Sequence, residues 1–149
     1  MRIAINGFGR IGRSVFRILD NNKEIDVVAI NDLSNLESLA YLLKYDTVMG
    51  RFSGNVYIED NIMHTDNKTI QMLNERNPEI LPWKKLDIDI VIEATGVFTK
   101  RSLLEGHLKA GAKKVLLTVP AKDEIDNTIV IGVNEHTLKS EHKIVSNAS

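Results

Sequence analysis

The chain alternates short apolar runs with longer amphipathic segments. Six runs are continuous rather than alternating and are rich in β-branched residues, which is typical of strands buried on both faces of a parallel sheet. They lie at residues 3–5, 27–30, 90–92, 115–117, 129–131 and 144–145. Because helical patterns separate several of these runs, the order strand, helix, strand recurs along the chain.

Three amphipathic segments predict helices. They lie at residues 10–19, from a capping-box pattern at residues 34–37 to near Tyr45, and from about residue 99 to residue 110, before Gly111. The apolar face of the first helix is expected to consist of Ile11, Val15, Ile18 and Leu19. Together with the apolar runs, these helices predict βαβ units and a mostly parallel sheet.

Residues 47–86 interrupt this rhythm. Glycine, asparagine and proline separate short segments there, such as residues 56–59 and 69–73, and indicate antiparallel hairpins. No repeat, low-complexity tract or linker divides the chain. We therefore expect one domain over residues 1–149, of the α/β class, with a doubly wound, mostly parallel sheet and an inserted antiparallel hairpin region at about residues 47–86.

Charge and composition narrow the class of function. The chain has 149 residues with 19 basic and 20 acidic side chains, so its net charge is −1 and no electrostatic reason favours nucleic acid or an anionic membrane. Because it contains no cysteine, it has no cysteine nucleophile and no thiolate metal site. No two of its histidines have metal-ligand spacing with a third ligand, so no metal is expected. Neither a signal-like start nor an apolar run near the ~18 residues of a membrane span is present, so we expect a cytoplasmic protein.

A GxGxxG pattern, Gly7-Phe8-Gly9-Arg10-Ile11-Gly12, follows the first apolar run and opens the first predicted helix. Glycines in this setting allow a tight turn, close approach of a pyrophosphate to the backbone, and close helix–sheet packing, as in a Rossmann fold. Asp32 stands 20 positions beyond Gly12, where a carboxylate can accept hydrogen bonds from ribose hydroxyls. A plain strand–helix turn is the alternative for the glycines alone. Asp32 favours a dinucleotide, and its charge favours NAD over NADP.

Further blocks of sequence occur in a fixed order along the whole chain. They are AINGFGRIGR at residues 4–13, LKYD at 43–46 followed by GRF at 50–52, ATGVF at 94–98, GAKKV at 111–115, PAKD at 120–123, GVN at 132–134 and IVSNAS at 144–149. In these blocks the chain resembles the amino-terminal half of phosphorylating glyceraldehyde-3-phosphate dehydrogenases. The resemblance implies an NAD-binding domain of a glycolytic oxidoreductase. The complete enzyme is expected to be a homotetramer that acts on glyceraldehyde 3-phosphate and phosphate.

The same resemblance implies roles for individual residues. Arg10 and Ile11 are placed at the pyrophosphate, Asp32 at the adenosine ribose and Arg76 beside the adenine. Thr95 and Gly96 are placed along the cofactor, and Thr118 near the nicotinamide carboxamide. The candidate cofactor-binding residues are therefore Asn6, Gly7, Gly9, Arg10, Ile11, Gly12, Asp32, Arg76, Thr95, Gly96 and Thr118.

The family's nucleophilic cysteine and activating histidine are not expected within this chain. Ser149 matches the residue before that cysteine and is the candidate substrate-binding residue, so the chain is expected to stop before the catalytic domain. The four histidines do not match the activating one and are interpreted as surface or helix-end residues: His64, His107, His136 and His142. We therefore expect NAD binding without turnover. The alternatives are the corresponding domain of an erythrose-4-phosphate dehydrogenase, or a non-catalytic Rossmann module that senses NAD.

Overall fold

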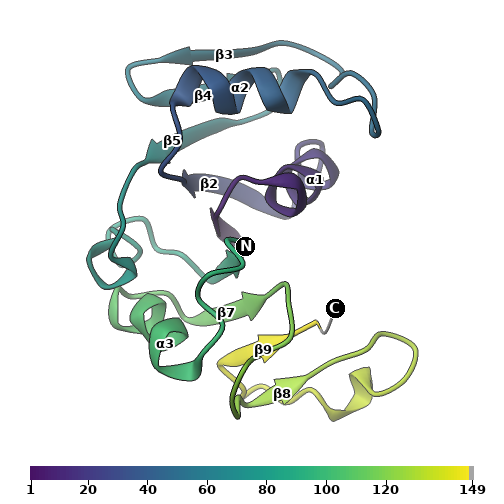
Figure 1. Cartoon of the computed structure of the whole chain (residues 1–149), viewed down its shortest axis with the longest axis vertical. Helices are drawn as coiled ribbons and strands as arrows, with labels where there is room; N and C mark the ends of the chain where they lie inside the picture. Colours follow the sequence, from purple (N-terminus) through teal and green to yellow (C-terminus); the bar gives the residue numbers. More distant parts are fainter. Residues whose placement is uncertain (148–149) are drawn as a thin grey trace.

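The computed structural model describes residues 1–147, which form one sheet with helices on both faces (Figure 1). Its strands are β1 (Arg2–Asn6), β2 (Asp26–Asn31), β3 (Val56–Glu59), β4 (Ile62–Thr65), β5 (Thr69–Leu73), β6 (Ile90–Glu93), β7 (Lys114–Leu117), β8 (Asn127–Thr128) and β9 (Ile144–Ser146). The α-helices are α1 (Arg10–Leu19), α2 (Leu36–Lys44) and α3 (Arg101–Lys109), and two 3₁₀ turns lie at Pro78–Ile80 and Glu135–Thr137.

The strand order confirms the predicted doubly wound sheet. Across the sheet the strands run β3-β4-β5-β2-β1-β6-β7-β9-β8, and every pair from β5 to β8 is parallel. Apart from the short edge strand β8, the parallel strands follow the order 3-2-1-4-5-6 of a Rossmann fold. The order reverses between β1 and β6, and this is the point where open α/β sheets bind their ligands.

The interruption at residues 47–86 is antiparallel, as its turn residues predict. Strands β3, β4 and β5 form an antiparallel meander. The last of them, β5, also pairs in parallel with β2, so the meander extends the main sheet instead of standing apart from it. The segment that follows β5 consequently returns to the edge of the sheet where β1 and β2 end.

Two helices cover one face of the sheet and the third covers the other. Phe16 of α1 and Leu39 of α2 share a core cluster with Ile5 of β1, whereas Leu104 of α3 packs against Val115 of β7 on the opposite side. Along β1, Ile5 faces the first of these clusters, whereas Ala4 faces the other side of the sheet, where it shares a cluster with Trp83 and Val91. Figure 1 shows α1 and α2 apart from α3.

The bounds of α1 agree with the prediction, and its buried face agrees in part, because Val15 and Leu19 pack against the core but the two isoleucines do not. Ile11 and Ile18 are 52% and 73% exposed, and the helix buries Gly12 and Phe16 instead. Gly12 lies so close to the carbonyl oxygen of Gly7 that no side chain fits between them. This backbone contact turns the Gly12 side of α1 toward the sheet, and the isoleucines therefore face solvent.

The prediction of a strand at residues 129–131 is also wrong. The strand there is β8 (Asn127–Thr128), and Ile129 only extends its ladder by donating its N–H to the Ser146 carbonyl at 2.8 Å. The Val130 N–H then donates to Oδ1 of Asn134 at 2.7 Å, and the Val130 carbonyl accepts from the Asn134 N–H at 3.1 Å. These bonds close a turn, which removes the apolar run from the sheet.

Candidate functional site

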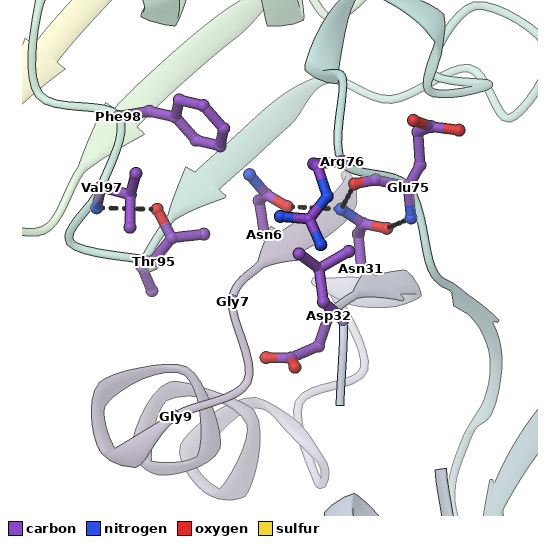
Figure 2. Close-up of a pocket in the computed structure, with 12 residues that line it drawn as sticks. Asn6, Gly7, Gly9, Asn31, Asp32, Glu75, Arg76, Thr95, Val97 and Phe98 are labelled. Atoms are coloured by element: carbon purple, nitrogen blue, oxygen red, sulfur yellow. Dashed lines mark hydrogen bonds between the residues drawn. The ribbon is translucent and has the colours of Figure 1, made fainter. Parts of the chain in front are cut away.

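A cavity of about 370 Å³ opens at the carboxyl edge of the sheet, where the strand order reverses. Its size suits a small-molecule ligand. It is lined by residues that follow β5, end or follow β2 and β1, and follow β6: Glu75, Arg76, Asn31, Asp32, Leu33, Asn6, Gly7, Gly9, Ala94, Thr95, Val97 and Phe98. Figure 2 shows polar side chains from β1, β2 and the segment after β5 on one side of this space, with Val97 and Phe98 on the other.

The three glycines of the loop meet three different requirements. Gly7 has φ +94°, and a Cβ there would lie 2.6 Å from the Thr95 nitrogen. At Gly12 a Cβ would collide with the Gly7 carbonyl oxygen. At Gly9, in contrast, a Cβ would have no heavy atom within 4 Å, so the backbone there faces open space. A tight turn, close helix packing and an approachable backbone are the three features that a pyrophosphate site requires of such a loop.

The amino end of α1 presents backbone N–H groups beside Gly9. Gly9 is the N-cap and supplies no side chain to the first turn. The N–H of Arg13 donates to the Gly9 carbonyl at 2.9 Å and forms the first intrahelical bond. The N–H groups before it therefore have no intrahelical acceptor, and they can donate to a phosphate together with the helix dipole.

Asp32 is held in a fixed orientation at the end of β2. Its Oδ2 accepts from the Phe8 N–H at 2.8 Å, and its Oδ1 accepts from the Ser34 N–H at 2.8 Å. The first bond joins the carboxylate to the glycine loop. A carboxylate has about four acceptor sites, so two remain for hydroxyl donors of a ligand.

Asn31 connects β2 to the segment that carries Arg76. Its Nδ2 donates to the Glu75 carbonyl and its Oδ1 accepts from the Glu75 N–H, each at 2.8 Å. Nδ2 also donates to Oδ1 of Asn6 at 2.8 Å. Arg76 therefore lines the cavity from a segment that Asn31 holds through the backbone of Glu75 (Figure 2).

Thr95 forms the wall after β6. Its Oγ1 donates to Oε2 of Glu93 at 2.6 Å and accepts from the Val97 N–H at 3.1 Å. These bonds hold the turn that presents Val97 and Phe98 to the cavity. This wall is apolar where it faces the space, which suits the flat surface of a base.

The cavity brings together six of the residues singled out in the sequence: Asn6, Gly7, Gly9, Asp32, Arg76 and Thr95. Arg10, Ile11 and Gly12 lie in the first turn of α1, next to Gly9, and Gly96 lies between Thr95 and Val97. Thr118 follows β7 outside the cavity lining, and its hydroxyl donates to the Glu93 carbonyl at 3.1 Å. Ser149 lies outside the described residues.

Two polar residues of this region, Asn31 and Glu93, had no assigned role in the sequence, and a third, His107, was expected at the surface or at a helix end. His107 lies in the last turn of α3, as expected for a helix-end residue, but it is fully buried and not on the surface. The signal that could have identified two of the three is positional. Asn31 and Glu93, like Asn6, are the last residues of apolar parallel strands.

Residues 1–147 contain neither a metal-ligand cluster nor a membrane-spanning helix. Within that range no three His, Asp or Glu side chains gather as metal ligands would. In the same part of the chain, no helix combines the length and apolarity needed to cross a membrane.

Comparison with known proteins identifies the family. Residues 1–101 match the family described as glyceraldehyde 3-phosphate dehydrogenase, NAD binding domain. The chain belongs to this family. NAD is accordingly its cofactor, and the open backbone at Gly9 beside the amino end of α1 fits the dinucleotide's pyrophosphate.

Three curated relatives extend the similarity beyond the matched residues. All three are named glyceraldehyde-3-phosphate dehydrogenase. They come from Thermotoga maritima (55% identical over 99% of this chain), Borreliella burgdorferi (53% over 100%) and Streptomyces coelicolor (50% over 100%). The matched region is 45% of each relative, so the chain spans about half the length of these proteins.

Proposed function

We propose that the cavity binds the adenosine half of NAD. The pyrophosphate lies on Gly9 and the first turn of α1, the ribose hydroxyls donate to Asp32, and the adenine lies between Arg76 and Phe98. The observation that carries this assignment is the Phe8–Asp32 hydrogen bond of 2.8 Å, which joins the anion-binding loop to the ribose acceptor within one cavity. Asn6 and Thr95 complete the lining around the base, and Gly96 lies in the turn between Thr95 and Val97.

The same geometry favours NAD over NADP. A 2′-phosphate on the adenosine ribose would face the Asp32 carboxylate, and like charges at short range repel. The next residue, Leu33, is 47% exposed beside the cavity and supplies no cation to compensate. Selectivity is therefore assigned to Asp32.

For the whole protein we propose oxidation of glyceraldehyde 3-phosphate, with phosphate as second substrate, in the cytoplasm. Names of the relatives and the family support this activity. When bound, NAD accepts the hydride. The residues of this chain bind and orient it, and they supply no cysteine nucleophile, because none of the 149 residues is a cysteine. We therefore expect the chain by itself to bind NAD without turnover.

A homotetramer is proposed for the complete enzyme. Exposed apolar side chains in α2 and in the loop after it support an assembly, because exposed apolar side chains that gather in one region mark interaction sites. Tyr41, Val48 and Met49 are 63%, 92% and 46% exposed. Light scattering of the chimera described below measures its mass, and a monomer would contradict this part of the proposal.

Calorimetric titration of the chain with NAD tests the cofactor site. We expect binding, and we expect Asp32→Asn to weaken it by about tenfold, because hydrogen bonds to a charged acceptor contribute about 1.5–3 kcal/mol. The affinity of this variant for NADP should fall less than its affinity for NAD. The matched control is Asp46→Asn, since Asp46 also accepts from two backbone N–H groups, of Val48 and Met49, but lies outside the cavity. No heat at millimolar NAD would overturn the proposed site.

A chimera tests the activity. Residues 1–149 replace the matched 45% of the Thermotoga maritima enzyme, and NADH formation is followed with glyceraldehyde 3-phosphate and phosphate. The same assay is repeated with erythrose 4-phosphate as the substrate. Faster turnover of glyceraldehyde 3-phosphate supports the proposal. A preference for erythrose 4-phosphate, or a soluble chimera that binds NAD without turnover, would contradict it.

A further inference from the structure

A row of polar side chains runs beneath the cavity, across the carboxyl ends of three adjacent strands. The sheet register pairs Asn6 with Asn31 of β2 and with Glu93 of β6. Register partners in a parallel sheet project to the same face, so the three side chains meet. Asn31 donates to Asn6 at 2.8 Å, and Asn6 donates to Glu93 at 2.6 Å. All three residues are buried.

Glu93 is the centre of this row and is only 1% exposed. Its Oε1 accepts from Nδ2 of Asn6 at 2.6 Å and faces Nε2 of His107 at 2.8 Å. Its Oε2 accepts from the N–H and the hydroxyl of Thr95, at 3.0 and 2.6 Å. Four donors match the acceptor capacity of an ionised carboxylate. Glu93 is thus satisfied by the protein itself and is absent from the cavity lining.

Trp83 determines which nitrogen of His107 carries the proton. The indole Nε1–H can only donate, and it lies 3.0 Å from Nδ1 of His107. Nδ1 is therefore the acceptor, so the proton is on Nε2 and is donated to Glu93. Trp83 and His107 are both fully buried, and neither lines the cavity. The row thus continues from the cavity to the core cluster around Trp83, on the same face of the sheet.

We propose that Glu93 is a positioning residue for the cofactor site, an inference that rests on the proposed NAD binding. Through Asn6 it holds the end of β1 against the end of β6, at the point where the strand order reverses, and through Thr95 it fixes the turn that follows β6. Through Asn6 it also orients Asn31, whose bonds to Glu75 fix the backbone of Arg76. His107, with its tautomer set by Trp83, supplies the fourth donor to Glu93.

The position of the row specifies which part of the ligand depends on it. Asn6, Thr95 and Arg76 line the cavity assigned to the adenosine half. Loss of the Glu93 carboxylate should therefore weaken NAD, ADP-ribose and AMP by the same factor. A purely structural role would lower the melting temperature and leave the three affinities of the folded protein unchanged.

The test compares Glu93→Gln with the wild-type chain. The amide nitrogen of glutamine would face donors where Glu93 has an acceptor, so about tenfold weaker binding of all three ligands is expected. The matched control is Glu79→Gln, since Glu79 is half exposed and pairs with Lys109 of α3 outside the cavity. Its affinities should equal those of the wild type.

A second pair of variants separates positioning from folding. In His107→Gln the amide oxygen can accept from Trp83 and the amide nitrogen can donate to Glu93, so NAD affinity should stay within about threefold of wild type. In His107→Leu both bonds are lost, and affinity should fall by about tenfold. If Glu93→Gln does not fold, this pair still tests the inference.

The single tryptophan of the chain supplies a spectroscopic reading of the same row. In a ¹H–¹⁵N NMR spectrum Trp83 gives one indole resonance, and we expect AMP to shift it in the wild type although Trp83 does not line the cavity. The shift should be lost in His107→Leu.

The outcomes distinguish the inference from the function on which it rests. Wild-type binding with unchanged affinities in folded Glu93→Gln and His107→Leu would overturn the inference alone. Failure of the wild-type chain to bind any of the three ligands would overturn the proposed function and the inference together.

Discussion

On the β1–α1 side of the cavity the backbone forms the site, whereas on the β6 side hydrogen bonds between side chains hold its wall in place. Gly7, Gly9 and Gly12 act through what they lack, because a Cβ at two of them would collide with the backbone and at the third would fill the open space. Opposite them, Glu93 and Thr95 act through hydrogen bonds of 2.6 to 3.0 Å.

Because of this difference, the two sides should respond differently to substitutions. On the glycine side a single added methyl group should be enough to disturb the site, since backbone atoms cannot move aside without changing the fold. On the Glu93 side a substitution can keep the volume of the side chain. Only the change from a hydrogen-bond acceptor to a donor then affects the site. Substitutions on the two sides should therefore affect the stability of the chain and its affinity for NAD to different extents.

The largest expected effect is that of Gly12→Ala. The added methyl group would meet the Gly7 carbonyl oxygen and lie 3.3 Å from Cγ2 of Ile5. We expect the free energy of unfolding to fall by about 3 kcal/mol or more, because overpacking against backbone has no cheap relief. Urea unfolding measures this loss. A variant within about 1 kcal/mol of wild type would show that α1 can withdraw from the loop without cost.

Asp126 tests a region outside both sides of the cavity. Burial raises the pKa of Asp126, but the N–H groups of Lys143 and Ile144 and the Arg101 guanidinium outweigh it and lower the pKa from 3.8 to about 2. Because the folded pKa is depressed, its contribution is present above the unfolded value and is lost as pH falls through the folded one.

Wild-type stability should therefore decline by about 2 kcal/mol from this group between pH 3.8 and pH 2. Asp126→Asn should lack this decline, start from a lower stability at neutral pH and bind NAD as the wild type does. Urea unfolding at several pH values measures the first two effects. Weaker NAD binding by this variant would mean that the far edge of the sheet contributes to the site.

Gly9→Ala is the matched partner of Gly12→Ala. Its φ of −77° suits alanine, and the new Cβ would meet no protein atom within 4 Å. Stability should stay within about 1 kcal/mol of wild type, while NAD affinity falls by about tenfold, because the methyl group occupies the space of the pyrophosphate. Thermal unfolding and calorimetry measure the two quantities. Unchanged affinity would place the pyrophosphate elsewhere.

The smallest effect is expected for Thr118→Val. Its hydroxyl donates to the Glu93 carbonyl at 3.1 Å, outside the adenosine cavity. AMP affinity should be unchanged, and NAD affinity should fall by about threefold through the nicotinamide side. Thr95→Val, the control, should weaken both ligands. Weaker AMP binding by Thr118→Val would extend the adenosine site as far as β7.

The comparison also shows where sequence patterns carry information. The loop could be predicted from Gly7 to Gly12 because its function depends on residues that are neighbours along the chain. Asn6, Asn31 and Glu93 share a visible feature, a polar residue at the end of an apolar strand. Which of them touch depends on the strand order β2-β1-β6, which no local pattern contains.

Two helical residues also show the limits of prediction from local sequence patterns. The bounds of α1 followed from its periodicity, yet Ile18 is exposed because a backbone contact at Gly12 sets the rotation of the helix. His107 is a helix-end residue by pattern, and it is buried because the end of α3 packs over Trp83 and Glu93.

By itself the sequence determined the α/β class, the antiparallel interruption, the glycine loop with Asp32, and the family, because each depends on local spacing or on residue identity. Only the tertiary structure decided which face of α1 is buried, where the strand near residue 128 ends, and how Glu93 is surrounded by four donors. Those features depend on contacts between segments far apart in the chain, such as Glu93 with Asn6, 87 positions away. Packing of the whole sheet sets such contacts, and a pattern of neighbouring residues does not.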